Sequence, residues 1–147
     1  MVITVFGLGF VGLTTALVFA EKGIKVYGTD TDREKLKMIT EGVLPFNEPE
    51  MAGALFRNLG RTFFPVEFAE SAISESSCIF YCVGTPSGGS GAADLSCLLK
   101  AIDNTLALIK DDSFRVLVIK STVPPSTVSS HIAPHVQKRA EAGGMRI

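Results

Sequence analysis

The stretch VITVFGLGFVGL, residues 2–13, joins a short apolar run to a glycine-rich turn and the beginning of a helix. The β-branched run Val2–Phe6 predicts a buried strand. Gly7, Gly9 and Gly12 follow it at the G-x-G-x-x-G spacing, which suits a tight turn, a close backbone approach to a pyrophosphate and a helix packed against the strand. Because free N–H groups and the helix dipole favour an anion at such a helix start, the stretch predicts a dinucleotide-binding unit.

The rest of the chain continues this alternation of strand and helix. Strand patterns run over Ile24–Thr29, Thr62–Val66, Cys78–Val83 and Arg115–Lys120. Helix patterns run over Phe10–Lys22, Arg33–Thr40, Pro49–Leu59, a segment ending near Glu75, Leu95–Ile109 and Ser126 onward. Such β-α-β units build parallel sheets with right-handed crossovers. We therefore predict one α/β domain over residues 1–147, a Rossmann-type doubly wound parallel sheet with helices on both faces, in three layers.

Three details of these helices are also predicted. The residues expected to face the sheet from the first helix are Val11, Thr15, Ala16, Phe19 and Ala20. Asp32 is expected to cap the second helix. In the last helix, Pro134 is expected to kink or divide a stripe formed by Val128, Ile132 and Val136.

Asp30 ends the second predicted strand, 21 residues after Gly9. A carboxylate at this place in a dinucleotide-binding unit accepts hydrogen bonds from the adenosine ribose and repels a 2′-phosphate. The sequence therefore predicts NAD as the cofactor in preference to NADP. The alternative is a glycine-rich turn that binds no ligand.

The segment VGTPSGGSGAADLS, residues 83–96, has the composition of a flexible linker. It leaves the carboxyl end of the predicted strand Cys78–Val83, however, and ligands of doubly wound sheets lie across the carboxyl ends of the strands. We therefore expect Gly84, Thr85 and Pro86 to line the ribose and nicotinamide side of the cofactor.

The segment KSTVPPST, residues 120–127, leaves the next predicted strand in the same way. Ser121 and Thr122 offer hydroxyl groups there, and the two prolines that follow stop the strand and turn the chain. Two polar loops at neighbouring strand ends favour a binding role over a linker for both.

Charge and cysteine content bound the class of protein. A net charge of −1 supplies no basic surface for nucleic acid or for an anionic membrane. The longest apolar run, residues 3–18, is interrupted by glycine and threonine and has no basic flank before it, so it predicts neither a signal peptide nor a membrane span. Three cysteines, an odd number, suit reduced thiols in the cytoplasm better than a disulfide framework.

The cysteines and histidines are expected to have no catalytic or metal-binding role. Cys78 and Cys82 alternate on one strand face and are expected in the core, and Cys97, at a helix start, is expected to be partly buried. His131 and His135 are one helical turn apart, but no third metal ligand is evident, so we predict a solvated pair and no metal site.

Taken together, the motifs resemble those of the UDP-glucose/GDP-mannose dehydrogenase family. The segments that carry the resemblance are FGLGFVGL (6–13), Asp30 with Lys35, PFNEPEM (45–51), VGTPS (83–87), ADLS (93–96) and KSTVPPST (120–127). The resemblance covers essentially the whole chain. It implies an NAD-dependent enzyme that oxidises the C6 alcohol of a nucleotide sugar twice, to a uronic acid, with UDP-glucose as the commonest substrate.

The resemblance also implies roles for particular residues. Phe10 and Val11 would meet the dinucleotide at the glycine turn, and Asp30 with Lys35 would hold the adenosine ribose, although Lys35 read alone is equally a solvated helix residue. Thr85 and Thr122 would contact the cofactor across the sheet, and Thr122 would also help to place a catalytic water. The complete predicted cofactor-binding set is Gly7, Leu8, Gly9, Phe10, Val11, Gly12, Asp30, Lys35, Val83, Gly84, Thr85, Pro86, Ser121 and Thr122.

The chain departs from the family pattern in two places. Glu50 stands where the family has a glycine, and we expect it to lie in the first turn of a helix, where an acid is favourable. The family continues past the last segment here with a further strand, a central helix, a nucleophilic cysteine and a second domain that grips the nucleotide. We therefore expect an N-terminal part of a longer, homodimeric dehydrogenase, which binds its nucleotide sugar through the C-terminal part. Without the nucleophile and the base, this part is expected to be inactive alone.

Other functions stay open at this point. GDP-mannose or a UDP-N-acetylhexosamine could be the substrate within the same family. A dehydrogenase of the hydroxyacid type would share the N-terminal fold, but FNEPEM and STVPPST argue against it. A non-catalytic dinucleotide-binding module is the third alternative.

Overall fold

The fold is built on one parallel sheet of five strands. The computed structural model describes residues 1–67, 69–86, 93–145 and 147. The strands are β1 (Val2–Phe6), β2 (Lys25–Thr29), β3 (Phe63–Pro65), β4 (Cys78–Tyr81) and β5 (Val116–Ile119). Their order in the sheet is β3-β2-β1-β4-β5, with every neighbouring pair parallel. The strand order reverses beside β1, which makes the edge between β1 and β4 the switch point of a doubly wound sheet.

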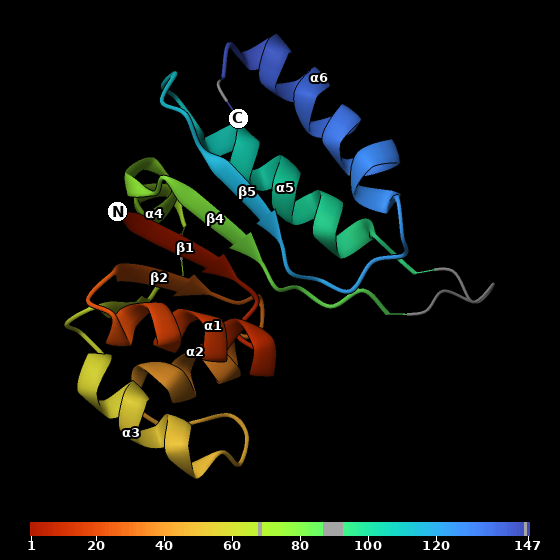
Figure 1. Cartoon of the computed structure of the whole chain (residues 1–147). Coiled ribbons are helices and arrows are strands. Elements are labelled where there is room, and N and C mark those ends of the chain that lie inside the picture. The colour runs from red at the N-terminus through yellow and green to blue at the C-terminus, as the bar shows by residue number, and fades with distance from the viewer. Residues whose placement is uncertain (68, 87–92, 146) are drawn as a thin grey trace.

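Helices cover both faces of this sheet (Figure 1). On one face lie α1 (Phe10–Glu21), α2 (Arg33–Thr40) and α3 (Pro49–Asn58). On the other lie α4 (Glu70–Glu75), α5 (Ser96–Leu108) and α6 (Ala133–Gly143). The predicted three-layer α/β fold is therefore confirmed.

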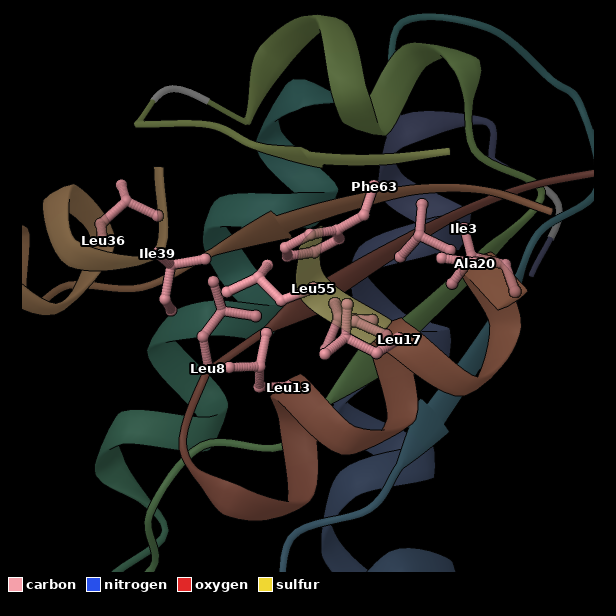
Figure 2. Packing of buried hydrophobic residues seen from close by; sticks show 12 residues of the cluster. Ile3, Leu8, Leu13, Leu17, Ala20, Leu36, Ile39, Leu55 and Phe63 are labelled. Atoms are coloured by element: carbon pink, nitrogen blue, oxygen red, sulfur yellow. The ribbon is translucent and has the colours of Figure 1, made fainter. Parts of the chain in front are cut away.

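Each face of the sheet has its own apolar core. Figure 2 shows the first of them, where Leu13 and Leu17 of α1 pack with Leu55 of α3 and Phe63 of β3. The second core joins β4 to α5 and includes the fully buried Tyr81. Both cores hold the strands rigidly, so that the loops at the strand ends start from fixed positions.

The face of α1 that packs on the sheet differs from the prediction. The buried residues are Gly12, Leu13, Ala16, Leu17 and Ala20, whereas Val11 is 49% exposed and Thr15 and Phe19 are half-buried. The helix is apolar on almost every side, so its periodicity does not specify a face. Its rotation is set instead by the close contact of Gly12 with the glycine turn.

The predicted Asp32 cap and Pro134 division are both confirmed. Asp32 Oδ1 accepts a hydrogen bond from the Lys35 N–H at 3.0 Å. A π-helical segment, Val128–Ile132, precedes α6, and Pro134 lies in the first turn of α6, where its missing N–H is tolerated. Only Ile132 of the predicted stripe is buried.

Polar contacts fix α3 against α1. Arg57 Nη2 lies 3.0 Å from a Glu21 carboxylate oxygen, and Asn58 also donates a hydrogen bond to that carboxylate. Thr62 Oγ1 donates to Asn58 Oδ1 at 2.6 Å, which holds the chain as it leaves the helix. Glu50 lies in the first turn of α3, as predicted.

Candidate functional site

The glycine turn lies at the switch point of the sheet. Gly7 has φ +87°, a conformation that side chains disfavour, and its N–H donates to the Thr29 carbonyl at 2.9 Å. A Cβ added at Gly7 would lie 2.7 Å from the Cys82 carbonyl oxygen, just past the end of β4. The turn therefore joins the ends of β1, β2 and β4 with no space for a side chain.

Gly9 and Gly12 serve two different needs. A Cβ added at Gly12 would lie 1.7 Å from the Gly7 carbonyl oxygen, so only glycine lets α1 begin this close to the strand. A Cβ added at Gly9 would meet no atom within 4 Å, and Gly9 supplies no capping side chain to α1. The space beside Gly9 at the start of α1 is thus open, and no side chain caps the helix there, which suits a pyrophosphate. The residues present fit a dinucleotide.

Leu8 has a structural role in this turn. Its side chain is fully buried among Leu13, Ile39 and Leu55, as Figure 2 shows. Its N–H donates to Asp30 Oδ2 at 2.7 Å. We therefore infer that Leu8 stabilises the turn, because its side chain packs in the core and its N–H is bonded to Asp30.

Asp30 is held by three donors of the protein. Besides the Leu8 N–H, its Oδ1 accepts from the Asp32 N–H at 2.9 Å and its Oδ2 lies 3.0 Å from Lys35 Nζ. Burial alone would raise the pKa of Asp30, but the hydrogen bonds from Asp32, Leu8 and Lys35 outweigh it and hold that pKa below its usual value. Asp30 is therefore an anion at neutral pH, at the end of β2 beside the turn.

Phe10 and Val11 are exposed at the start of α1, 55% and 49% respectively. The Phe10 ring packs edge-on against Phe46, with 5.5 Å between the ring centroids. Phe46 comes from the loop between α2 and α3, and the sequence assigned it no role, since only the tertiary fold brings that loop to the turn. The pair forms an apolar wall beside the N-terminal end of α1.

The loops after β4 and β5 are joined to each other. Thr85 Oγ1 donates to the Thr122 carbonyl at 2.6 Å, and Ser121 Oγ donates to the Val83 carbonyl at 2.7 Å. The Ser121 hydroxyl is therefore engaged between the strands, while the Thr122 side chain is exposed at the same edge of the sheet as Gly7. In Figure 1 the glycine turn and both loops gather at the edge to which the strands point.

The segment between β4 and α5 leaves and re-enters the domain at one place. Gly84 and Pro86 are exposed, and the Asp94 N–H donates to the Pro86 carbonyl at 2.8 Å. A loop closed across its base is not a linker between two bodies. Residues 87–92, which the predicted binding loop includes, lie outside the described residues.

The cysteines differ in their surroundings. Cys78 and Cys82 are half-buried against the first core, as predicted, and burial raises the pKa of both thiols, which keeps them protonated. Cys97 is exposed, so the prediction of partial burial was wrong. Cys97 lies in the first turn of α5, and it is not among the buried residues of that helix, which include Leu98 and Ile102.

The two histidines are not alike either. His131 is exposed, but His135 is half-buried and its Nε2 lies 2.8 Å from Asp103 Oδ1, so the prediction of a solvated pair was wrong for His135. Arg139 Nε lies 3.3 Å from the same oxygen. The sequence spacing within α6 gave no sign that α5 would lie opposite. Among the described residues, no group of three His, Cys, Asp or Glu side chains gathers as a metal site would require.

One hollow on the surface lies away from the glycine turn. A cavity of about 340 Å³ between α1 and α3 is lined by Leu17, Val18, Met51 and Ala54, among others, and by none of the predicted cofactor residues. The candidate site is instead the carboxyl edge of the sheet, the place where doubly wound sheets in general bind an extended dinucleotide. Within the described part of the chain, no helix is both long and apolar enough to cross a membrane.

Comparison with known proteins agrees with this geometry. The chain matches the UDP-glucose/GDP-mannose dehydrogenase family, NAD binding domain, over residues 1–147. It is 36% identical to a UDP-glucose 6-dehydrogenase of Pseudomonas aeruginosa, over 86% of this chain and 28% of that protein. It is 34% identical to the GDP-mannose 6-dehydrogenase of the same organism, over 93% of this chain and 32% of that protein.

A solved structure is similar over the same region. The UDP-glucose dehydrogenase of Pyrobaculum islandicum superposes with a TM-score of 0.88 and 33% identity, covering 99% of this chain and 34% of that one. This chain thus spans about a third of the length of each of these three relatives. Because the family matches the chain over residues 1–147, the chain belongs to the UDP-glucose/GDP-mannose dehydrogenase family, as an NAD-binding domain.

Proposed function

We propose that this chain is the cofactor-binding part of a nucleotide-sugar 6-dehydrogenase that oxidises UDP-glucose to UDP-glucuronate in two NAD-dependent steps. The observation that supports it most is the match to the family over residues 1–147, joined to a glycine turn built for a dinucleotide. Relatives that act on UDP-glucose and on GDP-mannose are similarly close, at 36% and 34% identity. GDP-mannose and a UDP-N-acetylhexosamine are therefore the alternative substrates.

In this proposal the residues of the chain bind and align the cofactor. NAD held there would supply the acceptor for a hydride from the C6 carbon of the sugar. The N–H groups at the start of α1, beyond Gly9, hold the pyrophosphate, and Asp30 with Lys35 faces the adenosine ribose. Thr85 and Thr122 lie at the ends of β4 and β5, where the nicotinamide end would extend.

Thr122 has a supporting role in the proposed chemistry. Its exposed side chain at the sheet edge would help to place the water that the second oxidation consumes. Aldehyde oxidation also needs a nucleophile, and Cys78 and Cys82 are protonated core residues unsuited to it. We propose that the nucleophile, the base and the nucleotide-sugar site belong to a C-terminal part, and that the complete protein is a cytoplasmic homodimer.

We expect that this chain binds NADH but forms no NADH when it is mixed with NAD and a nucleotide sugar. Binding is measured by NADH fluorescence, and turnover by NADH absorbance with UDP-glucose, GDP-mannose and UDP-N-acetylmannosamine. The expected reason for inactivity is that hydride transfer requires the sugar to be aligned with the nicotinamide. NADH formation that disappears in Thr122→Ala would contradict the assignment of catalysis to another part. Absence of NADH binding would contradict the proposed function itself and favour a module that binds something else.

A further inference from the structure

Asp30 and Lys35 form an ion pair at the place where the two nicotinamide cofactors differ. Lys35 Nζ lies 3.0 Å from Asp30 Oδ2, and the side chains are 27% and 8% exposed. NAD and NADP differ by a phosphate on the 2′-oxygen of the adenosine ribose, the group that the carboxylate after β2 faces. A group hydrogen-bonded to Asp30 would lie within roughly 6 Å of the Lys35 ammonium, which is two hydrogen-bond lengths.

The two charges act on a 2′-phosphate in opposite directions. The Asp30 anion repels it, and the Lys35 cation attracts it, so each weakens the effect of the other. The Asp30 carboxylate already accepts from the Leu8 and Asp32 N–H groups, so its position does not depend on Lys35 alone. Lys35 Nζ, in contrast, has Asp30 as its nearer carboxylate and Asp32 Oδ2 farther away at 3.9 Å, so loss of the Asp30 charge would leave the ammonium with only the weaker partner.

The other cations of α2 are engaged differently. Arg33 Nη2 lies 3.1 Å from Glu67 with its side chain 81% exposed, and Lys37 Nζ lies 3.9 Å from Glu41 with its side chain 76% exposed. Within the described residues, Lys35 is the cation that forms an ion pair with Asp30. Any cationic contribution at the 2′-position is therefore expected to come from Lys35.

We propose that Lys35 is a latent ligand for a 2′-phosphate that Asp30 neutralises, so that the pair, and not Asp30 alone, sets the preference for NAD over NADP. The inference rests on the proposed function, because it assumes that a dinucleotide lies on the glycine turn. It assigns Lys35 a specificity-determining role beyond that of a ribose contact.

The test is a double-mutant cycle read as binding, not activity. Dissociation constants for NADH and NADPH are measured by fluorescence titration for the unchanged chain, Asp30→Asn, Lys35→Met and the double variant. Asp30→Asn is expected to lower the ratio Kd(NADPH)/Kd(NADH) by about 10- to 100-fold, because a repulsive charge is lost and Lys35 is freed. Lys35→Met is expected to raise that ratio several-fold. In the double variant the fall in the ratio should be about tenfold smaller than in Asp30→Asn, because no lysine is left to attract the 2′-phosphate.

Controls keep the outcomes separate. Lys37→Met removes the same charge from the same helix and should leave the ratio unchanged. Asn at position 30 retains an oxygen that accepts from the Leu8 N–H, and if this variant still fails to fold, the Lys35→Met ratio decides the proposal. Two results would overturn the role of Lys35 while leaving the proposed function intact. One is that Asp30→Asn changes the ratio Kd(NADPH)/Kd(NADH) equally with and without Lys35. The other is an unchanged ratio in Lys35→Met. If the unchanged chain bound neither cofactor, the proposed function would fail first.

Discussion

Gly9→Asp is expected to abolish NADH binding while leaving the fold as stable as before. The backbone of Gly9 is extended (φ −70°, ψ −169°), and a Cβ there meets no atom within 4 Å, so the protein accommodates the side chain without strain. Aspartate is also a good N-cap and its charge complements the helix dipole. Its carboxylate would accept hydrogen bonds from the N–H groups of α1 that we propose for the pyrophosphate, and it would repel that anion. We expect NADH affinity to fall by about 100-fold or more.

Two measurements decide this prediction. The midpoint of thermal unfolding should be unchanged or slightly raised, and the fluorescence titration with NADH should show no saturation. Gly9→Asn is the matched variant, because it adds the same number of atoms and caps the helix without the charge, and its loss of affinity should be smaller. Full NADH affinity in Gly9→Asp would mean that the pyrophosphate does not lie at the start of α1.

Gly12→Ala is expected to have the opposite profile, a large loss of stability from a single methyl group. In a helix, alanine is ordinarily more favourable than glycine by up to about 1 kcal/mol. Here the new Cβ would lie 1.7 Å from the Gly7 carbonyl oxygen and 3.1 Å from the Cys82 Cβ, so α1 must move away from the strand. The shift would disturb the core around Leu13 and Leu17 and cost about 3 kcal/mol or more.

The control for Gly12→Ala is Gly53→Ala in α3. A Cβ at Gly53 would meet only the flexible end of Arg57, at 3.0 Å, so the same substitution should stabilise the chain or leave it unchanged. Urea unfolding of both variants gives the comparison directly. A Gly12→Ala chain as stable as Gly53→Ala would contradict the close contact between helix and turn, whereas failure of Gly12→Ala alone to fold would support it.

The order of elements and the glycine turn were predictable from sequence because their signals are local. The apolar run Val2–Phe6 and the three glycines act within one βα unit. The strands before Gly84 and Ser121 follow from the same kind of pattern, although β4 ends at Tyr81 and β5 at Ile119, slightly earlier than predicted. The parallel sheet then brings those ends to one edge by topology alone. This is why loops far apart in the chain could be assigned to one site.

Other features depend on contacts between elements and gave no local signal. The rotation of α1 is set by Gly12 against Gly7, since the helix is apolar on nearly all sides. The pairing of His135 with Asp103 requires α5 and α6 to lie side by side. The three donors on Asp30 come from the turn, the cap and a side chain one helical turn on. The sequence, which predicted Asp30 as a ribose ligand, gave no sign of these hydrogen bonds within the protein.

We expect NAD to lie across the carboxyl edge of the sheet, from the glycine turn to the ends of β4 and β5. Hydrogen exchange of the backbone amides, compared with and without saturating NADH, tests it at each position. We expect slower exchange on adding NADH at Gly9, Phe10 and Val11 and also at Thr85 and Thr122. Slowing confined to the glycine turn, or no slowing at any of these amides, would contradict it.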